Sequence, residues 1–488
     1  MPTPHPVNAG INILPDSSRV IVRSFIPADQ ESVLRVIERA MDLSEAQIAE
    51  RLAHLHEHFD RRHPALTDAW QEHYQHIRHL VPHESSLTPQ RRLYLGALFS
   101  GEYALESAAL FNPSITPHPD QNGLPAGSLR FIMSLRAVGE GHISSIAFRS
   151  GVVGADGRID LDPRQSLPCA PRLNPDPSFR RSVFFRKLND MEFDSPWTRA
   201  LIDSLGDTFT RSELDAALRT ACGSTRRDSR KAKHTIECIR WLATINYEVH
   251  FEPEVELSRR IIFPNSPLES NGIEDARFVR FTDDDGTITY YATYTAYNGR
   301  AVLPQLLETQ DFLNFRARSL TGPSVRNKGM ALFPRRIQGR HAMISRRDDE
   351  NLYLMLSDDI HRWDDSLLIR RPSEAWEAVK IGNCGSPIET PAGWLLLTHG
   401  VGPMRRYCIG AMLLDLKDPS IVLGHLAEPL IEPDEPARDG YVPNVVYSCG
   451  GLVHAGKLVL PYGLNDTSTT ITTIELDSIL SALDPGRG

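Results

Sequence analysis

The spacing of hydrophobic residues changes several times along this chain. Residues 27–101 and 175–241 carry apolar side chains at intervals of three and four, which predicts amphipathic helices. Residues 106–165 and the chain from Val255 onward carry short runs with a period of two, separated by Pro, Gly and Asp, which predicts strands and turns. We therefore expect a mainly β protein with an N-terminal helical segment (1–105), a first strand region (106–165), a helical insertion (166–250) and a second strand region (251–488).

The N-terminal helical segment contains a helix start and a pair of histidines. Ser44 and Gln47 have the spacing of a capping box, which predicts that a helix begins there. His54 and His58 lie one turn apart and could hold a metal on one helix face. No carboxylate or cysteine completes a convincing set of ligands, so we expect no metal site. We expect the helical insertion to pack on these N-terminal helices.

The most informative stretch runs from Asn271 to Arg277 and carries two adjacent carboxylates, Glu274 and Asp275. The flanking sequence predicts a strand, on which neighbouring side chains point to opposite faces. The two carboxylates would then not act jointly, as the acid and base of an ordinary glycosidase do. One could face a cleft while a neighbour such as Arg277 holds the other. The alternative is a structural or surface ion pair, since most Asp and Glu side chains are solvated.

Three further stretches change the balance between these alternatives. They are Tyr291–Tyr297, Gly393–Val401 and Val442–Tyr447, which follow Asn271–Arg277 in order. Together with it they resemble glycoside hydrolase family 130, the β-mannoside phosphorylases and related mannosidases. The resemblance runs from about Phe111 to the C-terminus, with an interruption near residues 165–250.

This resemblance implies a fold and a set of sugar-binding residues. Strand periodicity cannot choose between a sandwich, a barrel and a propeller, whereas members of family 130 are five-bladed β-propellers with the active site in a central funnel. Asp275 matches the catalytic acid of the family, which delivers its proton through a hydroxyl of the mannosyl residue. Asn112 and Arg136 match mannosyl-binding residues, and Lys380 and Asp466 match further sugar-binding positions. Without the resemblance, we would interpret Arg136 as part of a strand-end ion pair. Lys380 would be a solvated lysine, and Asp466 would be a turn residue.

The resemblance also implies the nucleophile. A phosphorylase needs cations and hydrogen-bond donors that hold a phosphate dianion beside the sugar. Lys328, Arg346, His399 and Tyr407 stand where the phosphorylases of the family bind phosphate. We therefore expect an inverting β-mannoside phosphorylase that cleaves manno-oligosaccharides with inorganic phosphate and produces α-mannose 1-phosphate. Phosphate is then a co-substrate, and no cofactor is expected.

Two alternatives remain open at this stage. Many phosphorylases of the family have Lys in the motif that here reads Pro387-Ile-Glu-Thr390. If Glu389 faced the funnel, it could repel phosphate or activate water, and the protein would be a β-mannosidase. The second alternative is a carbohydrate-binding propeller without turnover, because a fold does not prove an activity. The retained Asp275 and the cationic set with Lys328 and Arg346 speak against it.

Composition narrows the remaining possibilities. The formal net charge of −9 disfavours a nucleic-acid partner bound through a broad basic surface. No apolar run is long enough to cross a membrane, and the first residues do not read as a secretory signal. The six cysteines are scattered, as expected of a reduced protein. We expect a cytoplasmic enzyme that forms a homo-oligomer.

Overall fold

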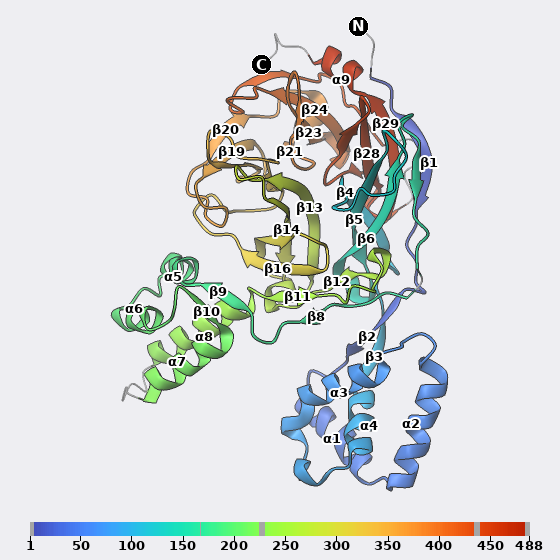
Figure 1. Cartoon of the computed structure of the whole chain (residues 1–488), viewed down its shortest axis with the longest axis vertical. Helices are drawn as coiled ribbons and strands as arrows, with labels where there is room; N and C mark the ends of the chain where they lie inside the picture. The colour runs from blue at the N-terminus through green and yellow to red at the C-terminus, as the bar shows by residue number, and fades with distance from the viewer. Residues whose placement is uncertain (1–3, 166, 224–229, 434–439, 484–488) are drawn as a thin grey trace. The chain divides into compact units, whose positions relative to one another are not determined.

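The computed structural model describes residues 4–165, 167–223, 230–433 and 440–483. It divides into two compact units (Figure 1). The smaller unit comprises Asp16–Ser107 and Gln165–Cys169, and the larger unit comprises Met1–Pro15, Ala108–Arg164 and Ala170–Gly488. The larger unit is built mainly from strands, which confirms the predicted mainly β class.

The smaller unit is helical around one hydrophobic core. Its helices are α1 (Gln30–Met41), α2 (Glu45–Phe59), α3 (Leu66–Ile77) and α4 (Pro89–Leu98), and its strands β2 (Val20–Ser24) and β3 (Ser100–Ala104) pair antiparallel. The predicted capping box is present, because the side chains of Ser44 and Gln47 each accept a hydrogen bond from the backbone N–H of the other residue. Leu66, Trp70 and Leu95 pack in the core that these helices share.

The strand-rich larger unit contains four sheets of four or more strands among its described residues. The largest follows the order β4-β5-β6-β13-β14-β15-β16-β11-β8, with β7 and β12 paired to β6. Its strands are β4 (Ala109–Pro117), β5 (Leu129–Val138), β6 (Ser144–Val153), β7 (Ile159–Leu161), β8 (Arg172–Leu173), β11 (Glu248–His250), β12 (Ile261–Ile262), β13 (Gly272–Thr282), β14 (Ile288–Tyr297), β15 (Val302–Thr309) and β16 (Asn314–Ser319). A parallel contact between Gly272 and Ser144 joins β13 to β6.

The other three sheets follow in chain order. The first contains β17 (Ala331–Leu332), β18 (His341–Ser345), β19 (Leu352–Ser357) and β20 (Leu367–Arg370). The second contains β21 (Lys380–Asn383), β22 (Ile388–Thr390), β23 (Gly393–Val401), β24 (Tyr407–Leu414) and β25 (Val422–His425). The third contains β26 (Val446–Tyr447), β27 (Leu452–His454), β28 (Lys457–Leu464) and β29 (Ser468–Glu475), and helix α9 (Leu476–Ala482) follows it.

The last sheet is completed by the beginning of the chain. Strand β1 (Val7–Ile13) pairs antiparallel with β29, so that the two ends of the chain lie side by side in the larger unit (Figure 1). The sequence did not predict this strand, because most of β1 is exposed and its pattern lacks a buried face.

The predicted helical insertion consists of α5 (Arg181–Asp190), α6 (Pro196–Asp203), α7 (Arg211–Gly223) and α8 (Arg230–Thr244), with the short strands β9 (Ser178–Arg180) and β10 (Thr208–Thr210). Its Phe184, Leu201 and Ile239 share a hydrophobic core with Phe148 and Phe278 of the largest sheet. The insertion therefore belongs to the larger unit. The sequence did not predict this packing of the insertion on the sheet.

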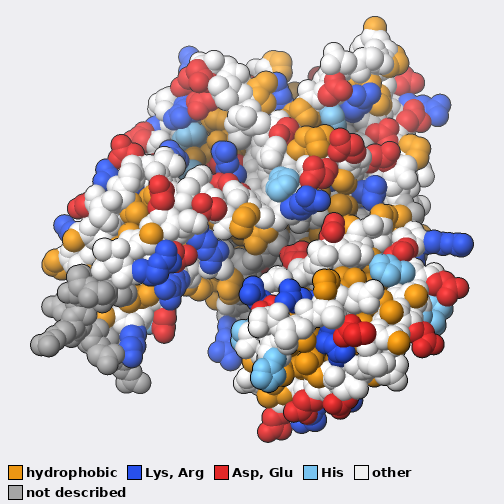
Figure 2. Space-filling view, turned by 60° about the horizontal axis from the view of Figure 1, so that its bottom comes forward, with side chains coloured by type: hydrophobic (Ala, Val, Ile, Leu, Met, Phe, Trp, Pro, Cys, Tyr) orange, Lys and Arg blue, Asp and Glu red, His pale blue; other side chains and the backbone are white. Residues whose placement is uncertain are grey.

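The surface and the thiols add two observations. On the face seen in Figure 2, acidic and basic side chains are interspersed. The thiols of Cys238, Cys384, Cys408 and Cys449 are free. No helix in the described part of the chain has the length and apolar character that crossing a bilayer would require.

Candidate active site

Two β-bulges place Asn112 and Asp275 face to face. The register of β4 shifts between Phe111 and Ser114, and that of β13 shifts between Glu274 and Arg277. Asn112 and Asp275 have left-handed backbones with φ of 47° and 53°, a conformation that Asn and Asp tolerate better than most residues. The Nδ2 of Asn112 donates a hydrogen bond of 2.8 Å to Oδ1 of Asp275.

The bulge in β13 overturns the expected orientation of the paired carboxylates. Arg136 on β5 lies 2.8 Å from Oε1 of Glu274 and 3.5 Å from Oδ1 of Asp275. Both carboxylates thus reach one guanidinium, and the prediction that they point to opposite faces is wrong. The alternation of side chains holds for a regular strand, whereas an inserted residue re-aims the side chains beside it. The Nζ of Lys328 lies 2.5 Å from Oε2 of Glu274 and joins the same cluster.

Arg277 is a buried part of the site that the sequence analysis considered only as a possible neighbour of the carboxylates. Its Nη1 donates a hydrogen bond of 2.9 Å to the backbone carbonyl of Asp275, and its Nη2 donates one of 2.7 Å to the hydroxyl of Tyr447. The same Nη2 lies 3.9 Å from Oδ2 of Asp275. Arg277 therefore stabilises the bulge through hydrogen bonds to the Asp275 backbone and to Tyr447. Tyr447, the partner of Arg277, lies in the family stretch Val442–Tyr447, and this was the sequence signal for the contact.

The carboxylates of Asp275 and Asp466 respond to this environment in opposite directions. Burial raises the pKa of Asp275, but Arg136, Arg277, the Asn112 amide and Lys328 outweigh burial and hold it below its usual value. Asp466 lies in the turn between β28 and β29 with φ of 52°. Burial, followed by repulsion from Asp275, raises the pKa of Asp466 to about 6. The site therefore holds an ionised Asp275 beside a carboxyl group that gains a proton more readily.

The predicted phosphate-binding residues form a second cluster. Arg346, just after β18, lies with its Nη1 3.0 Å from Nε2 of His399 on β23. Asp349 lies 3.5 Å from Arg346 and 3.0 Å from Nζ of Lys380 and so links these two cations. The ring of Tyr407, at the start of β24, is nearly parallel to the ring of His399 at a centroid distance of 6.1 Å.

His399 contributes to this cluster as a neutral ring. Burial, followed by repulsion from Arg346, Arg277 and Lys380, holds the pKa of His399 well below its usual value. Its Nε2 therefore accepts the hydrogen bond from Arg346, which leaves the proton on Nδ1. His399 is thus a hydrogen-bonding member of the cluster, because two guanidinium groups and a lysine surround its fully buried ring.

The two clusters meet at Tyr447. Its hydroxyl accepts the hydrogen bond from Arg277, and its ring packs edge-on against His399 at 4.9 Å. The structure thus gathers all the predicted residues except Asp466 into one connected set. Asp466 interacts with Arg136 and Asp275 through charge. The members come from β4, β5, β13, β21, β23 and β24 and from the loops after β16 and β18.

Glu389 lies elsewhere. It forms an ion pair with Arg335, whose guanidinium lies over the ring of Trp394. Glu389 pairs across the sheet with Trp394, which stands five residues before His399 on β23. At about 3.3 Å per residue this separates Glu389 from the His399 end of the strand by roughly 17 Å. Glu389 is therefore not placed to activate water at Asp275.

The comparison with known proteins gives the family. The family profile described as beta-1,4-mannooligosaccharide phosphorylase matches residues 227–485. The 1,2-beta-oligomannan phosphorylase of Thermoanaerobacter sp. (strain X514) is 32% identical over 230 residues, which cover 46% of this chain and 75% of that protein. The Beta-1,2-mannobiose phosphorylase of the same organism is 32% identical over 252 residues, covering 50% and 80%. The chain belongs to glycoside hydrolase family 130, as its motifs predicted.

A solved structure can also be aligned with this chain. The beta-1,2-mannobiose phosphorylase from Listeria innocua, in its complex with beta-1,2-mannobiose, superposes on 78% of this chain and 93% of that chain. The TM-score is 0.45, and the sequence identity is 22%.

Proposed function

We propose that this protein is an inverting β-mannoside phosphorylase that transfers the mannosyl group of a manno-oligosaccharide to inorganic phosphate and forms α-mannose 1-phosphate. We also propose that its strand units are the blades of a five-bladed propeller. The observation that carries the proposed function is the contact network that joins Asp275 to Lys328 and Arg346. A neutral sugar alone does not require such a concentration of cations, whereas a phosphate dianion does.

In the proposed reaction the bond between the anomeric carbon and the leaving oxygen breaks, and a phosphate oxygen forms the new bond from the opposite face of the sugar. Asp275 supplies the proton that the leaving oxygen needs, relayed through a hydroxyl of the mannosyl residue. Asn112 and Arg136 hold that mannosyl residue, with Lys380 and Asp466 as further sugar-binding residues. Lys328, Arg346, His399 and Tyr407 hold the phosphate.

The lowered pKa of Asp275 is compatible with this role. The cations beside it, Lys328 among them, are what lower its pKa. A bound phosphate dianion would offset their positive charge and raise the pKa of Asp275. Phosphate binding would thereby favour the protonated form of Asp275, which can act as the acid. Neutral His399, with its proton on Nδ1, would act as a hydrogen-bond partner for Arg346.

Hydrolysis has less support. The residue that could have served as the base for water, Glu389, is paired with Arg335. A phosphorylase of this kind needs no second carboxylate, since phosphate is already a nucleophile. We propose that phosphate is the co-substrate and that no cofactor takes part.

The deciding experiment supplies the purified full chain with β-1,2-mannobiose or with β-1,4-manno-oligosaccharides, each with and without inorganic phosphate. Phosphate-dependent formation of mannose 1-phosphate is the expected result, and the substrate that yields it identifies the linkage. Release of free mannose at the same rate in both conditions would mean that water is the nucleophile and would overturn the proposal.

A further inference from the structure

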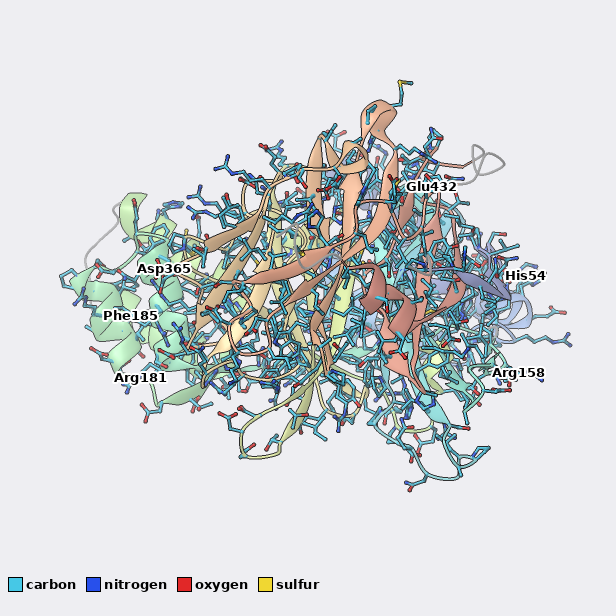
Figure 3. The ribbon with its side chains drawn as sticks, turned by 90° about the horizontal axis from the view of Figure 1, so that it is seen from above. His54, Arg158, Arg181, Phe185, Asp365 and Glu432 are labelled. Atoms are coloured by element: carbon cyan, nitrogen blue, oxygen red, sulfur yellow. The ribbon has the colours of Figure 1, made fainter. Side chains whose placement is uncertain are left out.

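A cavity of about 280 Å³ lies where the helical insertion meets the largest sheet. One side is formed by β9, β10 and α5, the helix marked by Arg181 and Phe185 in Figure 3. The other side is formed by β15, β16 and the loop that carries His361. The cavity shares no residue with the candidate active site. Its lining residues are charged or polar along most of the wall, with an apolar patch made by Phe179, Val183 and Phe184.

Lys187 is the most unusual residue of this cavity. It lies on α5 and is 4% exposed. Within the described part of the chain its Nζ has one hydrogen-bond partner, Oδ1 of Asn246 at 3.1 Å. An ammonium group has three donors, so two of them have no protein acceptor here. Burial, followed by repulsion from Arg318, lowers the pKa of Lys187 to about 7. A buried amine that borders a cavity and uses only one of its donors is costly to the fold unless something in the cavity accepts from the others.

The other basic residues of the wall add positive charge. Arg180 extends from β9 with its Nη2 3.3 Å from Nδ1 of His361, and no carboxylate lies within ion-pair distance of Arg180 in the described chain. The other nitrogen of His361 contacts Glu308 at 2.7 Å. The pKa of His361 is raised, since its contacts with Asp359 and Glu308 outweigh burial. This imidazole is therefore more readily protonated than usual.

Acidic side chains compensate only part of this charge. Arg318 pairs with Glu248 at 2.6 Å, and Arg316 lies 3.8 Å from the same carboxylate. Glu308 pairs with His361, as described above. The basic lining residues are Arg180, Lys187, Arg316, Arg318 and His361, against the single acidic lining residue Glu308. Glu248, Glu308 and Asp359, which lies 3.5 Å from Nδ1 of His361, offset part of this charge, and the wall keeps a smaller excess of positive charge and of hydrogen-bond donors.

We propose that this cavity is a second anion site of the protein, which binds the phosphoryl group of a phosphomonoester such as a hexose phosphate. Arg180 and Lys187 converge on it from the insertion, and Arg316 and Arg318 from the sheet. Donors that approach from several directions suit a tetrahedral dianion, and guanidinium groups recognise phosphate in pairs of hydrogen bonds. The patch of Phe179, Val183 and Phe184 would cover the carbon skeleton of the ligand, which free phosphate lacks.

The test is a binding measurement and requires no turnover. Glucose 6-phosphate and inorganic phosphate are titrated into the full chain by calorimetry, first with the wild type and then with Lys187→Met and Arg180→Gln. We expect each substitution to weaken glucose 6-phosphate binding by about tenfold or more, the usual effect of losing a charge-assisted hydrogen bond. We expect the wild type to bind glucose 6-phosphate more tightly at this site than inorganic phosphate. If inorganic phosphate bound as tightly as glucose 6-phosphate, the proposed phosphomonoester would be wrong, and free phosphate would be the ligand.

The variants are chosen so that folding does not obscure the result. Lys187→Met is close in size, and Oδ1 of Asn246 keeps the hydrogen bond from the backbone N–H of Ser319 at 2.9 Å. Arg180→Gln changes an exposed side chain. Arg199→Gln on α6, whose ion pair with Asp194 is outside the cavity, is the matched control and should bind as the wild type does.

A variant of the candidate active site separates this proposal from the proposed function. Arg346→Gln should leave glucose 6-phosphate binding unchanged if the ligand sits in the insertion cavity. Loss of binding in Arg346→Gln, or undiminished binding in both Lys187→Met and Arg180→Gln, would overturn the second site. Failure of the protein to form mannose 1-phosphate would not affect it.

Discussion

Asn112 donates a hydrogen bond to the carboxylate of Asp275 across 163 positions of sequence, and both residues are held in left-handed backbone conformations by bulges in adjacent strand regions. Such conformations cost roughly 1–3 kcal/mol each and persist where the surrounding structure imposes them. Arg277 and Arg136 supply that constraint through their contacts with Asp275. Two of the left-handed residues of the chain thus lie where the proposed chemistry takes place.

Replacing Asp275 should remove turnover while the fold persists. In Asp275→Asn the amide oxygen can still accept from Asn112, but the group can no longer donate or regain a proton. We expect turnover to fall by about 10²- to 10⁴-fold, the usual contribution of a general acid. The measurement is mannose 1-phosphate formation, with the circular dichroism spectrum as the check on folding. Asp285→Asn, in the exposed turn of the same hairpin, is the control and should keep full activity. An active Asp275→Asn enzyme would remove this residue from the mechanism.

Glu389 gives a prediction in the opposite direction. Because Glu389 contacts Arg335 and lies far along β23 from His399, Glu389→Gln should leave the rate and its phosphate dependence unchanged. A surface ion pair of this kind contributes about 0–1 kcal/mol, so stability should change little. The measurement is the rate of substrate cleavage by Glu389→Gln and by the wild type, each with and without phosphate. A large loss of mannose release in Glu389→Gln would revive the hydrolytic alternative.

Asp466 should make stability depend on pH in a defined window. Its pKa is about 6 in the folded protein against the usual 3.8, so the folded state binds the proton more tightly than the unfolded state. The stability that neutral Asp466 provides is complete below about pH 4 and is lost as the pH rises through 6. Asp466→Asn mimics the neutral form. At pH 8 we expect the free energy of unfolding of Asp466→Asn to exceed that of the wild type by at most about 3 kcal/mol, which raises its melting temperature. At pH 4 we expect the two proteins to unfold at a similar temperature.

The control for Asp466 is Asp365→Asn, an exposed carboxylate on the larger unit (Figure 3). It should show no difference from the wild type that grows with pH. Equal melting temperatures of Asp466→Asn and the wild type at both pH values would contradict the raised pKa of Asp466.

Tyr447 offers a test of the buried hydrogen bond between its hydroxyl and Arg277. Tyr447→Phe removes the acceptor for Nη2 of Arg277, whose side chain is 1% exposed. Leaving a buried donor unsatisfied costs about 1–3 kcal/mol, so the melting temperature of the larger unit should fall in a calorimetric scan. Tyr407→Phe is the matched control, because in the described chain the Tyr407 hydroxyl makes no hydrogen bond. An equal change in both variants, or no loss in Tyr447→Phe, would mean that the hydrogen bond to Arg277 does not support the site.

Much of this protein could be predicted from its sequence. The stretch from Asn271 to Arg277 and the later motifs identified the family, and the local signals of Ser44 and Gln47 located a helix start. These features are local, since each depends on a few neighbouring residues whose order the sequence contains. The same motifs selected side chains such as Arg346 and His399, which the fold does bring together.

The tertiary structure decided the orientation, the protonation state and the surroundings of those side chains. The bulge that turns Asp275 toward Asn112 interrupts the pairing of β13 with β14, and its partners Asn112 and Arg136 are distant in sequence, so strand alternation alone gave the wrong orientation. The neutral state of His399 and the raised pKa of Asp466 come from burial and from charges far away in sequence, and periodicity contains neither. Lys187 acquires its cavity only because the insertion packs on the sheet. Residue types and motifs are written along the chain, whereas burial, charge neighbours and register exist only after the chain has folded.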